Sequence, residues 1–318
     1  MSFKIKLFGG KSKEKHFDVE SPNKNVKCRV KIANGRIYYE VRKNNDVLIR
    51  ESRLGFKLHG ENDLGQDLVL VRTQKKSESS VWEPIVGEEK QIHNEYNETI
   101  FYLTETTEKQ RLFSLRFRVF NEGVAFRYEI PPQPSFQRII IMDELTEFNL
   151  DLNGQAWRIP AYQATKYELN YEKWPVYELR DSVHTPLTVE TNNNKYVAIH
   201  EAALYNYGSM TLKMNANKHL QADITPLSDG VKAYVDLPFD SPWRVIMIAD
   251  SAIELTVNRM ILNLNNSPKE DFSWVKPLKF LGIWWAMYVG EWTWAEGRKH
   301  GASTEHAKQY LDFCLKLA

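Results

Sequence analysis

The strongest constraint in this sequence is an alternation of apolar and charged residues that leads directly into Asn-Gly. Residues 26–32, VKCRVKI, alternate without a slip, and Asn34-Gly35 follows. Residues 37–41 then continue the alternation. Asn-Gly between two alternating segments is the strongest short signal for a β-hairpin. In an antiparallel sheet this pattern directs one face to the core and the other to water, so the segment predicts amphipathic antiparallel strands.

The same pattern recurs along the chain. Residues 113–119 and 124–130 alternate on either side of the turn Asn121-Glu122-Gly123. Few windows before Ser267 show a helical period, so the pattern predicts a mainly β fold, a large antiparallel β-sandwich over residues 17–272 after an N-terminal tail at 1–16. Further strands are predicted around residues 47–49, 196–205, 210–214, 231–237 and 245–249.

Charge and composition exclude several classes of partner. The 318 residues carry a formal net charge of +1, and the two signs are mixed along the chain. We therefore expect neither nucleic acid nor a membrane surface as a partner. No stretch is long and apolar enough to span a bilayer, and Lys4 and Lys6 interrupt the apolar run at the N-terminus. As written, the sequence indicates a soluble chain that is not exported. Cys28 and Cys314 lack metal-type neighbours, which favours two buried free thiols.

The character of the chain changes near Ser267-Pro268. Residues 273–318 are predicted to be a linker and the first βα unit of a truncated (β/α)8 barrel. Residues 280–287, FLGIWWAM, are continuously apolar, as in a parallel strand buried on both faces. A tryptophan-rich loop at 288–301 follows, and residues 303–318 have a helical period. One helical face is predicted to hold Ala307, Tyr310, Leu311, Cys314 and Ala318.

His200-Glu201 lies at the end of an apolar strand. A metalloprotease zinc motif would need a second histidine four residues after the first, where the chain has Leu204, so zinc is rejected. Glu201 is the polar end of an apolar row, and an unpaired buried charge is costly. The residues alone favour a carboxylate at the sheet rim, or one paired with an arginine such as Arg180. The alternative is a metal ligand or a binding-site carboxylate.

Two loops are further candidates. Residues 177–184 are polar and aromatic, and either line a site or form a well hydrogen-bonded surface loop. Trp292 and Trp294 follow the predicted parallel strand, where α/β barrels build their active sites. An indole offers a flat apolar face suited to a sugar ring, although packing is an equal alternative. Glu291 and Glu296 lie in the same loop and are not assigned a catalytic role.

Five ordered segments together resemble glycoside hydrolase family 97. They are SPNKNVKCRVKIANGRIYYEV, NEGVAFRYEIP, YVAIHEAALYNYG, SPWRVIMIADS and the segment from VKPLKF to YLDF. The resemblance runs from about Phe17 to the end of the chain. It implies an N-terminal β-supersandwich, a central (β/α)8 barrel and a small C-terminal β domain. It also implies an exo-acting α-glucosidase or α-galactosidase with calcium at its active site, in proteins that are periplasmic or secreted.

The resemblance assigns a role to Glu201, in AIHEAAL, as the sandwich residue that binds the calcium ion. Calcium takes six to eight oxygens, so the remaining ligands and the catalytic carboxylates are expected in the missing C-terminal barrel of the same chain. The expected substrate is an α-linked oligosaccharide or glycoside, with Trp292 and Trp294 in contact with the sugar. Without the barrel we expect no hydrolysis. Two alternatives stay open: a non-catalytic carbohydrate-binding sandwich, and a purely structural domain.

Overall fold

The computed structural model describes residues 14–317 apart from 135, 164–168, 268–269, 277 and 279. The chain divides into two compact units. The first, here called the β domain, contains Glu89–Ser267 and the described residues up to Pro84. The second, here called the C-terminal unit, contains Ile85–Glu88 and the described residues after Ser267.

The largest sheet of the β domain has ten strands within the described residues. Their bounds are Leu68–Trp82 (β6), Ile92–Glu105 (β7), Leu112–Phe120 (β8), Gly123–Ile130 (β9), Gln155–Arg158 (β12), Glu172–Pro175 (β13), Leu187–Glu190 (β15), Tyr196–Ala202 (β16), Phe239–Asp240 (β20) and Trp243–Ala249 (β21). The order is β13-β12-β15-β16-β21-β9-β8-β7-β6, and β20 pairs with β9.

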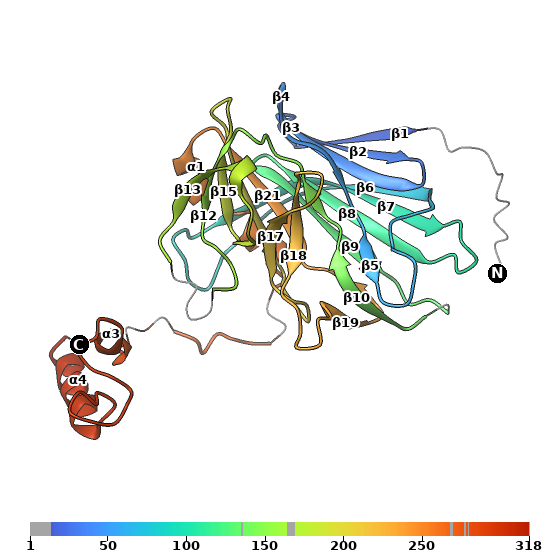
Figure 1. Ribbon diagram of the computed structural model, residues 1–318. Coiled ribbons are helices and arrows are strands. Elements are labelled where there is room, and N and C mark those ends of the chain that lie inside the picture. Colours follow the sequence, from blue (N-terminus) through green and yellow to red (C-terminus); the bar gives the residue numbers. More distant parts are fainter. Residues whose placement is uncertain are drawn as a thin grey trace. The chain divides into compact units, whose positions relative to one another are not determined.

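Three smaller sheets complete the domain (Figure 1). The first joins Lys15–Glu20 (β1), Val26–Ala33 (β2), Arg36–Lys43 (β3) and Asp46–Arg53 (β4) in chain order. The second has the order β19-β10-β5, from Ala233–Asp236 (β19), Arg138–Glu144 (β10) and Phe56–Leu58 (β5). The third has the order β11-β18-β17-β14, from Glu147–Phe148 (β11), Leu220–Ile224 (β18), Met210–Met214 (β17) and Val183–His184 (β14). A single turn of 3-10 helix spans Val176–Glu178.

One continuous apolar core lies between the ten-stranded sheet and the smaller sheets. Tyr39 of β3 packs on Phe126 of β9 with ring centroids 4.8 Å apart, and Phe126 packs on Phe117 of β8 at 5.2 Å. Such aromatic contacts add to the stabilisation from burial. All pairings between the named strands are antiparallel in the described residues. The predicted large antiparallel β-sandwich is therefore confirmed.

The predicted hairpin turn forms between β2 and β3. Ala33 pairs with Arg36, and the two residues between them, Asn34 and Gly35, have φ of 51° and 70°. Positive φ at both central residues is what a tight hairpin turn requires, and asparagine and glycine tolerate it best. Cys28 of β2 points into the core, and burial raises the pKa of its thiol, which makes the thiol unreactive.

Two short helices cover part of the outer face of the ten-stranded sheet. They are Ala252–Thr256 (α1) and Met260–Leu264 (α2). Met260 and Leu264 pack with Trp243 and Val245 of β21 in a second, smaller apolar cluster. No helix in the part of the chain that the structure describes is long and apolar enough to cross a membrane.

The C-terminal unit corrects one prediction. The apolar run at residues 280–287 is not a buried strand: Phe280 is 93% exposed, and Trp284–Tyr288 forms a short helix (α3). A strand buried on both faces needs hydrogen-bonded neighbours, and none pairs with this run within the described residues. The predicted C-terminal helix does form, as Thr304–Leu317 (α4). Tyr310 and Cys314 are half-buried, whereas Leu311, expected on the same face, is 62% exposed.

Candidate functional site

Glu201 lies one residue before the end of β16 and points toward the interior of the sandwich. Its exposed fraction is 7%. One carboxylate oxygen, Oε1, accepts the backbone N–H of Met210 at 2.8 Å. The other, Oε2, accepts Nη1 of Arg244 at 2.7 Å. Arg244 is also the residue paired with Glu201 across β16 and β21, so the register of the ten-stranded sheet brings these two side chains together.

Arg244 binds a second carboxylate, that of Glu144 at the end of β10. Nε lies 2.8 Å from Oε1 of Glu144, and Nη2 lies 2.6 Å from Oε2. Both side chains are fully buried. Burial alone would lower the pKa of the Arg244 guanidinium, but the charges and hydrogen bonds of Glu144 and Glu201 outweigh it and raise that pKa. Arg244 therefore keeps its proton, and its guanidinium is shared between the carboxyl groups of Glu144 and Glu201. We call Glu144, Arg244 and Glu201 the buried triad.

Each carboxylate oxygen of Glu144 also accepts a hydrogen bond from a hydroxyl group. Thr146 donates to Oε1 at 2.8 Å, and the phenol of Tyr207 donates to Oε2 at 3.2 Å. Burial and the nearby charge of Glu144 raise the pKa of Tyr207, so its hydroxyl keeps the proton that it donates. The hydroxyl of Tyr128 lies 2.8 Å from that of Thr146. A buried ion pair needs such extra partners to offset the loss of hydration, and here they fix Glu144 from several sides.

Thr185, which directly follows the predicted polar loop, contacts the neighbourhood of Glu201. Thr185 directly follows β14, and its hydroxyl donates to the carbonyl oxygen of Met210 at 3.1 Å. Nδ1 of His200 lies 3.1 Å from the same hydroxyl. The backbone of Met210 is thereby held by Thr185 through its C=O and by Glu201 through its N–H. Thr185 and Glu201 thus contact the same residue, Met210, and neither contact involves residues 177–184.

Of the alternatives left open for Glu201 by the residues alone, the structure shows the ion pair with an arginine. Glu201 does form an ion pair with an arginine, yet that arginine is Arg244, and Arg180 is exposed. Sequence reasoning missed both Arg244 and Glu144. The signal for Arg244 was present, because it is the one charged residue in the otherwise apolar run WRVIMIA and a charge in a buried strand needs a partner. No local signal marks Glu144 as that partner.

The two predicted tryptophans lie in the C-terminal unit. Trp292 stacks on His306 of α4, with ring centroids 3.7 Å apart and planes 12° apart. It also contacts Tyr310 edge-on. Trp294 is 57% exposed. The structure therefore shows packing for one face of Trp292 and leaves Trp294 available to a ligand.

The described residues do not form a calcium site on their own. Calcium takes six to eight oxygen ligands, and no group of three or more His, Cys, Asp or Glu in the described part of the chain is placed to hold a metal ion. Glu201 nevertheless suits a place as one ligand. Each of its oxygens accepts one hydrogen bond and keeps a lone pair, and the buried triad has two carboxyl groups for one guanidinium.

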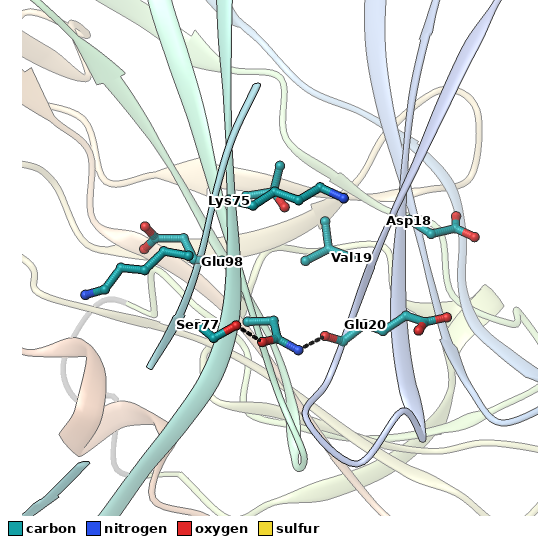
Figure 2. Close-up of a pocket in the computed structure, with 9 residues that line it drawn as sticks. Asp18, Val19, Glu20, Lys75, Ser77 and Glu98 are labelled. Carbon is teal, nitrogen blue, oxygen red and sulfur yellow. Dashed lines mark hydrogen bonds between the residues drawn. The ribbon is translucent and has the colours of Figure 1, made fainter. Parts of the chain in front are cut away.

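A separate groove of about 530 Å³ lies where β1 approaches β6 and β7. Figure 2 shows Asp18 and Glu20 on one side of it and Lys75 and Ser77 on the other. The side chain of Asn97 spans the groove, because it accepts from Ser77 at 2.6 Å and donates to the carbonyl oxygen of Glu20 at 2.9 Å. This bridge ties the two layers together, and none of the predicted site residues lines the groove.

Comparison with known proteins shows which class and which family of proteins this chain belongs to. A solved glycoside hydrolase family 97 enzyme from Pseudoalteromonas sp. strain K8, in complex with panose, shares the fold with a TM-score of 0.88 and 36% sequence identity. The alignment covers 94% of this chain and 46% of that one. The class is therefore that of glycoside hydrolase β-sandwich domains. The family model described as Glycosyl-hydrolase 97 N-terminal matches residues 19–267, and the chain belongs to this family.

Two curated relatives carry names that state an activity. A retaining alpha-galactosidase of Bacteroides thetaiotaomicron is 22% identical over 336 residues, which cover 94% of this chain and 48% of the relative. A probable retaining alpha-galactosidase of Streptomyces bingchenggensis is 23% identical, over 89% of this chain and 41% of the relative. The chain thus spans about half the length of the relatives it matches.

Proposed function

We propose that this chain is the N-terminal part of a calcium-dependent, exo-acting α-glycosidase that hydrolyses α-glucosidic or α-galactosidic bonds. Family membership and the names of the relatives support the reaction class. Glycoside hydrolysis needs a pair of carboxylates at the scissile bond. We assign that pair to residues outside this chain, so the chain itself has no hydrolase activity.

The observation that carries the proposal is the fixed carboxylate of Glu201. Arg244 and the N–H of Met210 hold its two oxygens, and Glu144 fixes Arg244 in turn. A metal ligand needs this kind of orientation by neighbouring groups. In the proposed role, Glu201 donates carboxylate oxygen to a calcium ion whose other ligands come from outside the described residues. When bound, the ion would supply positive charge next to the reacting sugar.

Trp292 and Trp294 keep a proposed role in sugar contact. Trp294 has the larger free surface, since His306 already covers one face of Trp292. An exposed indole binds the C–H face of a sugar through apolar contact. We assign the sugar contact chiefly to Trp294 and a supporting role to Trp292.

The first test is the DNA sequence beyond the codon for Ala318. We expect an open frame that continues through repeated strand–helix units with carboxylates after the strands. A stop codon at that point would contradict the proposal and leave a stand-alone sandwich.

In the protein encoded by that longer frame, Glu201→Gln should weaken calcium binding by more than about tenfold, since one charged ligand is lost. The matched control is Glu190→Gln, which alters a half-buried glutamate paired with Lys173 and should leave calcium affinity unchanged. Calorimetric titration with calcium measures both. Equal affinities in the wild type and in Glu201→Gln would remove Glu201 from the metal site.

A further inference from the structure

A hollow of about 510 Å³ opens on the β domain close to the end of β16. Its wall is formed by the loop that follows β16, by β19, β20 and the connection between them, by Arg127 of β9 and by Asn266. Tyr205 and Tyr234 both line it, with exposed fractions of 52% and 47%. We call it the Tyr205 hollow. A concave surface that combines exposed rings with a few polar groups is typical of small-ligand sites.

The loop that carries Tyr205 is held in an unfavourable backbone conformation. Ala203 has φ of 52° and Asn206 has φ of 51°. For alanine this left-handed conformation is unfavourable, because its Cβ comes close to the following carbonyl oxygen. The side chain of Asn265 accepts the backbone N–H of Ala203 at 2.9 Å, which fixes the turn. Such strain is concentrated at ligand-binding positions in proteins, and here it presents Tyr205 and Asn206 to the hollow.

Two further residues that line the hollow, Tyr234 and Phe239, are held by their neighbours. The hydroxyl of Tyr234 donates to Asp229 at 2.6 Å. Phe239 lines the hollow and packs on Tyr207, with ring centroids 5.8 Å apart. Because Tyr207 donates to Glu144, it connects Phe239 to the buried triad. The ring of Tyr234 is therefore held in place before any ligand arrives, which lowers the entropic cost of binding.

The charged groups at the hollow are already paired with one another. Nη2 of Arg127 lies 2.8 Å from Glu129 and 3.2 Å from Asp240. Asp236 forms a two-pronged pair with Arg138. No lining arginine or lysine in the described residues is left without a carboxylate, so the hollow is poorly suited to phosphate or sulfate.

Several polar atoms of the wall remain available. The side-chain amides of Asn206 and Asn266 make no hydrogen bond within the described residues, and one oxygen of Asp240 is likewise unengaged there. Amides donate and accept, and a carboxylate accepts. This set matches the hydroxyl groups of an uncharged sugar, and the rings of Tyr205 and Tyr234 match its C–H faces.

We propose that the Tyr205 hollow binds one neutral sugar unit of an oligosaccharide, as a non-catalytic site that requires no calcium. This inference goes beyond the proposed hydrolase function and does not depend on Glu201 as a metal ligand. The site would hold a substrate chain on the β domain, at the same end of β16 as the buried triad. Recognition would come from stacking and hydroxyl contacts.

The test is a titration of the purified chain with panose, a neutral α-linked trisaccharide, in EDTA. Calorimetry gives the affinity, and saturation-transfer NMR gives the contacted sugar. We expect binding in the wild type, and a loss of about tenfold in Tyr205→Ala and in Tyr234→Ala, since each variant removes one stacking ring. The matched control is Tyr171→Ala, because Tyr171 is 60% exposed and lines none of the hollows described above. Its affinity should equal that of the wild type.

Two further measurements keep the test decisive. Asp240→Asn serves as a second variant if either tyrosine variant shows a lower unfolding temperature, and inorganic phosphate at the same concentration should not bind. Absence of panose binding in the wild type would overturn the proposal, and so would equal binding in the wild type, Tyr205→Ala, Tyr234→Ala and Asp240→Asn. Either result would leave the α-glycosidase proposal standing, because that proposal concerns Glu201 and residues outside this chain.

Discussion

Arg244 and Glu144 lie 100 positions apart in the sequence and form a two-pronged ion pair that is closed to water, with an exposed fraction of 0% for each side chain. Arg244→Met would leave the carboxylates of Glu144 and Glu201 buried without a cation. Removing one partner of a buried pair typically costs about 3–5 kcal/mol. We expect a loss of this size in the free energy of unfolding, measured by urea denaturation.

The control for this prediction is Arg138→Met. Arg138 and Asp236 form an equally two-pronged pair at 2.7 and 2.9 Å, but their exposed fractions are 61% and 69%. Water and salt screen such a pair, so the variant should unfold at nearly the wild-type urea concentration. Similar losses in the two variants would show that burial does not set the strength of the Arg244–Glu144 pair.

Asp143 gives a prediction for pH. Burial raises the pKa of its carboxyl group, while the nearby Lys213 and Lys232 act in the opposite direction. The folded state therefore holds the Asp143 proton more tightly than the unfolded state does. The stability from this group is complete below its ordinary pKa of 3.8 and is lost as the pH rises through the higher folded value. Asp143→Asn should thus gain stability relative to the wild type between about pH 3 and pH 7.

The opposite trend is expected at Asp250, which serves as the control. Hydrogen bonds from Lys195 and Lys43 lower the pKa of its carboxyl group. Its contribution is present above its ordinary pKa and is lost as the pH falls through the lower folded value. Asp250→Asn should therefore be less stable than the wild type at pH 7 and close to it in strong acid. Parallel pH profiles of the two variants in thermal unfolding would contradict the assignment.

Gly123 begins β9 at a position that has no room for a side chain. Its φ is 153°, and a Cβ there would overlap the carbonyl oxygen of Ile246 and come within 2.7 Å of Sδ of Met260. We expect Gly123→Ala to cost on the order of 3 kcal/mol, measured by thermal unfolding. Gly60→Ala is the control, because Gly60 has φ of 65° with nothing within 4 Å of its Cβ position. That variant should lose only about 1 kcal/mol.

The C-terminal unit predicts solubility behaviour. Phe280, Leu278 and Leu315 are exposed by 93%, 84% and 77%, and exposed apolar surface promotes association. A chain that ends at Ser267 should therefore remain monomeric at higher concentrations than the full chain in light scattering. A full-length Leu278→Ser/Phe280→Ser variant should lie between the two. Lower solubility of the shortened chain would place the domain boundary elsewhere.

The sequence predicted what depends on neighbours along the chain. The hairpin at Asn34-Gly35 and the strands on both sides of Gly123 follow from local alternation and turn chemistry, and the structure confirms both. The predicted strand at 210–214 matches β17. Glu201 at the end of a buried row also follows from alternation.

Contacts between distant segments were not predictable in this way. The pairing of Arg244 with Glu144 depends on how the ten-stranded sheet lies against β10, which no local pattern encodes. The run at 280–287 shows that apolar composition alone does not predict a strand. Its apolar composition suits a buried strand, but a strand also requires hydrogen-bonded neighbours, and within the described residues the run has none. Composition indicates which residues can be buried, whereas the presence of neighbouring strands determines which residues are buried.

The antiparallel pairing of β9 with β21 joins the two halves of the ten-stranded sheet, and it links Phe126 with Arg244. During synthesis, one edge of β9 therefore stays unpaired until β21, which ends at Ala249, has left the ribosome. At about 5–20 residues per second this interval lasts roughly 6–24 s. Open edges readily pair with other chains, and late long-range pairing slows folding. Every newly made chain can therefore pair wrongly with other chains for several seconds. Chaperones or rapid dilution during this period determine the yield of folded protein.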